Sequence, residues 1–222
     1  MSVSRDAASA QEPGADLLAA AFLEAGFRHI AVQNTPEYEA TTIDQIAAAG
    51  GVTSHVVGRY FATKDAIILS IVDDIIVAVA TELARIPPQT SPPEALLAAT
   101  TAVISDIANG AGVITRERMQ ALAHILTASL ELRKKASALG EQVLTVALAE
   151  RMGVGPEDPR VRQAVTIRAA VIAAAYNFDR GGRVRLDPRN DGRVPELMVK
   201  RLNDTFTHIT GRAPAHPNRP SR

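Results

Sequence analysis

The chain has 222 residues, 46% of them hydrophobic but only 4% aromatic, and it has no cysteine and no tryptophan. The absence of cysteine excludes disulfides, zinc–thiolate sites, iron–sulfur clusters and thiol catalysis. No apolar stretch approaches the roughly 20 residues that a membrane-spanning helix needs, and the N-terminus lacks the pattern of a secretory signal. We therefore expect a cytoplasmic protein that does not bind membranes.

The 24 basic and 24 acidic residues cancel, but they are unevenly placed. Residues 1–75 carry four Lys or Arg against ten Asp or Glu, whereas residues 180–222 carry ten against four. Overall neutrality therefore says little about partners, while the acidic first third bears directly on the motif found there.

Helical periodicity, interrupted by glycine and proline, predicts an all-α fold of about nine helices with no strand. A polar N-terminal arm (1–14) and a proline-containing tail (211–222) are expected to be disordered. Between them we predict a helix-turn-helix unit over 15–70 and a larger bundle over 71–210. The expected helices begin and end at about residues 15–26, 42–49, 54–60, 64–86, 93–109, 115–127, 131–152, 158–178 and 194–210, with a loop at 28–40.

The two short helices near residue 50 have the signals of a helix-turn-helix. Thr42 and Gln45 form a capping box at the start of the first, and Gly50-Gly51 supplies the turn. Thr53 is placed to cap the second helix, whose N-terminal side chains would then meet base edges in a major groove. An ordinary helical hairpin is the alternative, because short helix pairs with a glycine turn are common.

The residues around this turn resemble the signature of the tetracycline-repressor (TetR) family of regulators. The resemblance is carried by TTIDQIA at 41–47, GVT at 51–53 and RYFATKDAI at 59–67. It is strong over 41–69 and fair over 15–27, and elsewhere only the number and spacing of helices agree. It implies an all-helical homodimer that binds a palindromic DNA operator and is released by a small apolar or amphipathic molecule.

The position of each residue on its helix and the chemistry of its side chain together predict which residues contact DNA. The hydroxyl and imidazole groups at the start of the second helix can bond bases or phosphates, and Val56 can touch a thymine methyl. Lys64 begins the long helix, where its charge and the free N–H groups form a phosphate site. Two alternatives stay open: Tyr60 as a packing residue, and Thr53 as a cap only. The predicted set is Thr42, Thr53, Ser54, His55, Val56, Arg59, Tyr60 and Lys64.

Three departures from the family pattern keep a second hypothesis open. Gly58 stands where the family usually has a phosphate-contacting aromatic residue, the loop at 28–40 is longer than usual, and the N-terminal unit is acidic. The alternative is a helical dimer of the same fold with degraded DNA binding, which acts through ligand or protein contacts.

The bundle should provide both the dimer interface and the ligand site. The helices at 158–178 and 194–210 are apolar on faces suited to a four-helix interface between two copies. Arg168 is the sharpest polar candidate for the ligand site, because a cation on an otherwise apolar helix needs a partner. Its alternatives are that it points to solvent or meets a carboxylate such as Asp106. The predicted ligand residues are Val79, Leu83, Val103, Ile107, Met119, Leu122, His124, Leu126, Leu144, Leu148, Arg168, Tyr176 and Asn177, and core packing would also explain each of the apolar ones.

An enzyme is not expected. The five histidines show no metal-ligand spacing, and the sequence has neither a glycine-rich phosphate loop after a strand nor a G-x-S-x-G motif. We therefore predict no catalytic residues, no metal and no cofactor.

Overall fold

A computed structural model describes residues 41–49, 51–175 and 194–211 of the chain. Within these ranges the chain is helical and contains no strand. The helices are α2 (Ile43–Ala49), α3 (Ser54–Tyr60), α4 (Lys64–Leu83), α5 (Pro92–Ala108), α6 (Arg116–Ala128), α7 (Leu130–Met152), α8 (Pro159–Ala175) and α9 (Val194–Thr210). The expected helix at 15–26, the loop at 28–40 and the tail beyond Gly211 lie outside the described residues.

The chain divides into two compact units, one ending at Ile67 and the other beginning at Ile68. The dividing point falls inside α4, so this helix contributes its first turn to one unit and its remainder to the other. The described core of the first unit is small, and Ala47 from α2 and Val57 from α3 are each only 1% exposed.

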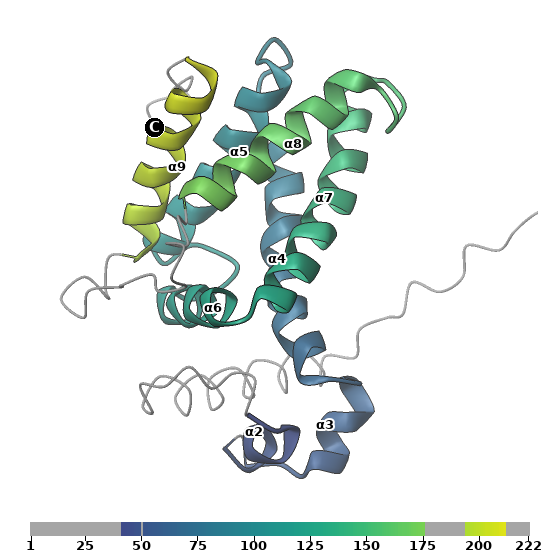
Figure 1. The fold of residues 1–222 in the computed structure, drawn as a ribbon, viewed down its shortest axis with the longest axis vertical. Helices are drawn as coiled ribbons and strands as arrows, with labels where there is room; N and C mark the ends of the chain where they lie inside the picture. The colour runs from purple at the N-terminus through teal and green to yellow at the C-terminus, as the bar shows by residue number, and fades with distance from the viewer. Residues whose placement is uncertain (1–40, 50, 176–193, 212–222) are drawn as a thin grey trace, which may run out of the picture. The chain divides into compact units, whose positions relative to one another are not determined.

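The second unit is a helical bundle in which α5 holds the central place. Nine of its residues are buried, and it packs against α6, α8 and α9. In Figure 1, α8 crosses α5 between α9 and α7, and all three contacts of α8 are confirmed by residue pairs. The small side chains Ala95, Ala99 and Ala164 are fully or almost fully buried, which lets these helices approach closely.

Most helix ends follow local signals, but two boundaries differ from expectation. We predicted that α4 runs to Ile86, whereas it ends at Leu83 and continues as a turn before Pro87. Between α6 and α7 we expected a gap of several residues, yet Ser129 alone separates them. Its N–H donates to the carbonyl of Ile125, and its hydroxyl accepts from the N–H of Leu132, so one buried residue ends α6 and begins α7.

Candidate nucleic-acid interface and ligand cavity

The predicted capping box at the start of α2 is present with both of its hydrogen bonds. The N–H of Thr42 donates to Oε1 of Gln45 at 2.9 Å, and the N–H of Gln45 donates to Oγ1 of Thr42 at 3.2 Å. This reciprocal pair satisfies two donors that a helix N-terminus otherwise leaves unbonded. The hydroxyl of Thr42 is therefore already engaged in fixing where α2 begins.

The turn between α2 and α3 is set by Gly51 and Thr53. Gly51 has a φ of +68°, a left-handed conformation that glycine adopts without steric cost. Thr53 lies at the N-cap of α3, and its Oγ1 accepts from the N–H of Val56 at 3.4 Å. The capping role that we left open for Thr53 is thus present in the structure.

Two polar contacts within this unit join residues that no local pattern in the sequence pairs. The hydroxyl of Ser54, at the start of α3, donates to a carboxylate oxygen of Asp44 in α2. The ammonium of Lys64, at the start of α4, donates to the carbonyl of Thr41 at 3.1 Å. Both bonds hold helix N-termini against the segment that begins at residue 41.

The side chains nominated for DNA binding are mostly accessible. Thr42, Thr53, His55, Arg59 and Tyr60 are exposed. The other three, Ser54, Val56 and Lys64, are half-buried. Tyr60 is 36% exposed and therefore contributes to packing as well as to the surface. The first turn of α3 thus offers hydroxyl, imidazole and apolar groups together, which are groups that can read base edges.

Gly58 leaves an open space on the exposed side of α3. A Cβ built at this position would meet no heavy atom within 4 Å among the described residues. Packing among the described residues therefore does not require glycine here, because a Cβ can be added without displacing a neighbour.

The second unit contains a cavity of about 430 Å³, within the range of roughly 300–1,000 Å³ typical of small-molecule sites. All six helices from α4 to α9 contribute to its lining. Most lining side chains are apolar. The apolar walls include Val72, Ile75, Ile76 and Val79 from α4, Met119, Leu122 and Leu126 from α6, and Met198 and Leu202 from α9.

Arg168 brings a positive charge to this apolar space. Its Nε donates to Oγ1 of Thr100 in α5 at 3.2 Å, and the Thr100 hydroxyl donates in turn to the carbonyl of Leu96 at 2.7 Å. On the α7 side, the Nη1 atom lies 3.7 Å from where a Cβ on Gly140 would stand. The guanidinium is therefore bonded to the buried hydroxyl of Thr100 on α5 and lies next to Gly140, which has no side chain, on α7.

One side of α7 forms an exposed border of the cavity that is polar except at its first residue. Leu130, Lys134, Ser137 and Glu141 line the cavity, and all four are exposed. Their spacing of three or four residues places them along one side of the helix. The cavity therefore opens to solvent along this side of α7.

The predicted ligand residues separate into three groups. Five of them line the cavity: Val79, Met119, Leu122, Leu126 and Arg168. Five others, Leu83, Val103, Ile107, Leu144 and Leu148, are buried in the core and do not line it. Of the rest, Tyr176 and Asn177 lie outside the described residues, and of His124 only its position in α6 is described. Helical periodicity identified buried faces, but it did not distinguish the cavity wall from the solid core.

The cavity lining also includes residues that were not expected. Gly140, Ser137 and Glu141 belong to a stretch of α7 that reads as a mixed polar surface. The only sequence signal for Gly140 is that it interrupts the middle of a long helix, where glycine costs about 1 kcal/mol relative to alanine. A Cβ at this position would stand at ordinary contact distance from Ile76 and Arg168, so the glycine leaves a methyl-sized space open in the lining.

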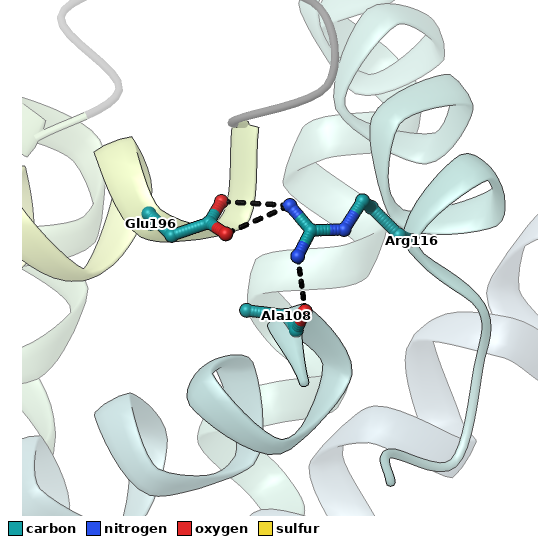
Figure 2. Close-up of polar contacts among 3 residues, drawn as sticks. All are labelled: Ala108, Arg116 and Glu196. Carbon is teal, nitrogen blue, oxygen red and sulfur yellow. Dashed lines mark hydrogen bonds and ion pairs between the residues drawn. The ribbon is translucent and has the colours of Figure 1, made fainter. Parts of the chain in front are cut away.

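A polar clasp at one end of the bundle connects three helices. Nη1 of Arg116 donates to both carboxylate oxygens of Glu196, at 2.8 and 2.9 Å, and Nη2 donates to the carbonyl of Ala108 (Figure 2). These residues belong to α6, α9 and the last turn of α5. Since α6 and α9 both line the cavity, the clasp fixes the spacing of two of its walls.

Two kinds of feature are absent from the described residues. None of the helices is long and apolar enough to cross a membrane. In the same ranges, no three histidine or acidic side chains gather in a way that could hold a metal ion.

The fold is similar to that of SmeT, the repressor of the Stenotrophomonas maltophilia multidrug efflux pump SmeDEF. The similarity has a TM-score of 0.51 and covers 92% of this chain and 97% of the SmeT chain, at 18% sequence identity. No family model matches the chain, and no curated protein sequence matches it. Across the described residues, the chain therefore has the all-helical fold that its resemblance to the tetracycline-repressor family implies.

Proposed function

We propose that this chain is a transcriptional repressor of the tetracycline-repressor family, a homodimer that a small molecule releases from a palindromic operator. The observation that carries the proposal is that α4 contributes residues to both the helix-turn-helix unit and the cavity lining. Its first residue, Lys64, is bonded within the helix-turn-helix unit, and further along it Val72, Ile76 and Val79 line the cavity. One continuous helix thus belongs both to a DNA-binding motif and to a small-molecule site.

The proposed mechanism is a shift between two conformations of the dimer. In one, the two copies of α3 are spaced by about one DNA turn, roughly 34–36 Å, and enter successive major grooves. A ligand that fills the cavity favours the other, because it binds the two conformations with different affinities. The shared helix α4 is the element through which the position of α3 depends on the occupancy of the cavity.

The proposed dimer interface consists of segments 158–178 and 194–210. On α8, Ala170 and Ala174 are exposed, and on α9, Ile209 is 43% exposed. Small side chains four residues apart allow a second helix to approach closely.

Introducing a charge at the centre of this face, as in Ala170→Glu, is expected to yield monomers in analytical ultracentrifugation. Val146→Glu, at an exposed apolar residue of α7, is the matched control and should remain dimeric.

DNA binding is the decisive test. Fluorescence anisotropy would follow the full chain on DNA from upstream of its own gene, with nonspecific competitor and at several salt concentrations. If Arg59 and Lys64 are the phosphate-neutralising cations, a dimer makes about four such contacts, and the slope of log K against log salt is about −3.6. Arg59→Ala should reduce the slope to about −1.8 and weaken binding, whereas Arg85→Ala, which removes an exposed cation in the turn after α4, should change neither.

The competing hypothesis, a helical dimer with degraded DNA binding, is favoured by two observations. The Ser54 hydroxyl is bonded to Asp44, and Gly58 offers no side chain at a usual phosphate contact. If the wild-type chain selects no sequence from a random DNA library but Gly58→Tyr does, this alternative is correct and the repressor proposal is wrong. Gly58→Ala controls for the change in helix propensity.

A further inference from the structure

The described lining of the cavity has an excess of positive charge. Arg133, Lys134 and Arg168 border it, against the single carboxylate of Glu141. Around these groups the walls are aliphatic and come from all six helices. A site with apolar walls and a small number of cations is complementary to a molecule with an apolar body and a negative group.

Of the three cations, Arg168 is the best placed to select an anion. Lys134 is 62% exposed and pairs with Glu131 at 2.8 Å, so water screens any further contact that it makes. Arg168 is half-buried, and its Nε is bonded to Thr100, which is only 5% exposed. A guanidinium held in this way presents a planar fork that matches a carboxylate, and the lower local polarity strengthens the attraction.

At Gly140, no side chain of α7 stands between the helix backbone and the guanidinium of Arg168. Gly140 is buried in the middle of α7, and the site of its absent Cβ lies 3.4 Å from Ile76 and 3.7 Å from Nη1 of Arg168. Ile76 of α4 and Gly140 line the cavity next to the guanidinium, and aliphatic residues of α6 line the same cavity. A linear chain can therefore extend from the charged group into apolar space.

We propose that the effector is an amphipathic anion: a carboxylate on a single aliphatic chain, with its carboxylate at Arg168 and its chain against α4 and α6. The inference rests on the proposed function only in naming this molecule an effector, because binding itself does not require DNA. It goes beyond that proposal by assigning the charge of the ligand and the residue that recognises it.

The experiment compares three probes with the same ten-carbon chain and different head groups. Decanoate, 1-decanol and decyltrimethylammonium would be titrated into the full-length protein without DNA, below micelle formation, using isothermal titration calorimetry. We expect decanoate to bind at least about tenfold more tightly than decanol, as a charge-assisted hydrogen bond provides, and the cation to bind most weakly. Equal or tighter binding of decanol or the cation would overturn the proposal.

Variants test whether Arg168 is the residue that gives the preference for decanoate over decanol. Arg168→Gln should bring the decanoate-to-decanol ratio close to one, and Arg168→Lys should keep an intermediate preference. Arg162→Gln is the matched control, since Arg162 is exposed on the same helix, is paired with Glu157 and does not line the cavity. An unchanged ratio in Arg168→Gln would contradict the assignment even if decanoate binds.

A second variant protects the test against a loss of folding. Thr100→Val removes the hydroxyl that positions Nε of Arg168 while keeping the volume and the charge. It should weaken decanoate binding, while decanol, which meets a methyl group in place of the Thr100 hydroxyl, should bind at least as tightly as to the wild-type chain. General damage to the core would weaken both. If the chain binds decanoate but no DNA, this inference stands and the repressor proposal fails. If it binds an operator but does not prefer the anion, only this inference fails.

Discussion

Gly112 lies in the loop between α5 and α6, directly against the last turns of α5. A Cβ at this position would be 2.4 Å from Cγ1 of Ile107, 2.6 Å from its Cα and 2.7 Å from its N. Ile107 is fully buried, and two of the three atoms belong to the helix backbone, so neither can move without a shift of α5. The space at Gly112 is therefore fixed by the core rather than by the loop.

Gly112→Ala should lower the free energy of unfolding by about 1–3 kcal/mol, the usual cost of overpacking. Chemical denaturation with urea, monitored by circular dichroism, would measure the change. Gly155→Ala is the control, because a Cβ there meets nothing within 4 Å, and a change within about 0.5 kcal/mol is expected. Equal stability of the two variants would mean that the loop relaxes freely around residue 112.

Asp158 makes a pH-dependent contribution at the start of α8. Its carboxylate accepts from the N–H of Arg160 at 2.8 Å and from Nε and Nη2 of the same residue at 3.0 and 2.8 Å. The Arg160 side chain, followed by its backbone N–H, lowers the pKa of Asp158 to about 2. In the unfolded chain the carboxyl has a pKa of about 3.9, so its stabilising effect is complete above that pH and is lost as the pH falls towards 2.

The variant Asp158→Asn isolates this charge, because asparagine is an equally good helix N-cap. The variant should melt below the wild-type chain at pH 7, and the difference in Tm should shrink between about pH 4 and pH 2. Asp204→Asn, which removes an exposed ion pair with Lys200 in α9, should change Tm little throughout. A constant Tm difference for Asp158→Asn down to pH 2 would show that its carboxylate is not the titrating group.

At the scale of helices, the Arg116 clasp connects ends that are distant in the sequence. Arg116 and Glu196 are 30% and 50% exposed, so their ion pair by itself contributes less than about 1 kcal/mol. The second bond of Arg116, to the Ala108 carbonyl, adds a cation at the C-terminus of α5, where the helix dipole favours it. The guanidinium therefore contributes more than the carboxylate.

A double-mutant cycle separates the two contributions. Arg116→Ala should cost about 1–2 kcal/mol of unfolding free energy, since the carbonyl bond is lost as well. Glu196→Ala should cost about 0.5 kcal/mol, with a coupling energy of similar size. Arg85→Ala, which breaks an exposed pair within one turn of helix, is the control and should be nearly neutral. A larger loss from Glu196→Ala than from Arg116→Ala would contradict the assignment to Ala108.

Local signals in the sequence were sufficient to predict most of the helices. The capping hydroxyls of Thr42, Thr53 and Thr115 act within three residues of their partners, and Gly153 ends α7 in the left-handed conformation. Such interactions depend on neighbours along the chain, and a single sequence displays them directly. The one-residue break at Ser129 was missed, because a buried serine can either continue a helix or end one.

The contacts that build the sites were not predictable in the same way. Arg116 and Glu196 are 80 residues apart, Arg168 and Thr100 are 68 apart, and Ser54 and Asp44 are 10 apart. Each pair depends on how helices pack, which no local pattern encodes. Helical periodicity also placed both Leu144 and Leu122 on buried apolar faces, although Leu144 is fully buried in the core and Leu122 lines the cavity. Arg168 was found because a cation on an apolar helix is anomalous on its own.

At the scale of the whole molecule, the two proposed sites share helix α4 and differ in charge. The proposed DNA-binding unit is acidic in sequence and would have to meet phosphates through Arg59, Lys64 and helix N-termini, whereas the described cavity lining has more cations than carboxylates. An anionic effector would therefore bind where the charge is favourable, without competing directly for the DNA-binding surface. Its effect on DNA must then be exerted through conformation.

If the two sites are coupled in this way, their effects on each other must be equal. Saturating decanoate should weaken operator binding by about 5- to 150-fold, and saturating operator should weaken decanoate binding by the same factor, because the coupling free energy is a property of the pair. Anisotropy titrations with and without decanoate give the first factor, and calorimetry with and without operator gives the second. In Arg168→Gln the decanoate effect on DNA should disappear at the same concentration, while operator affinity without ligand stays as in the wild-type chain. A decanoate effect on DNA binding that persists in Arg168→Gln would show that decanoate acts elsewhere on the protein. Operator binding that saturating decanoate leaves unchanged would show that α4 does not couple the cavity to the proposed DNA-binding unit.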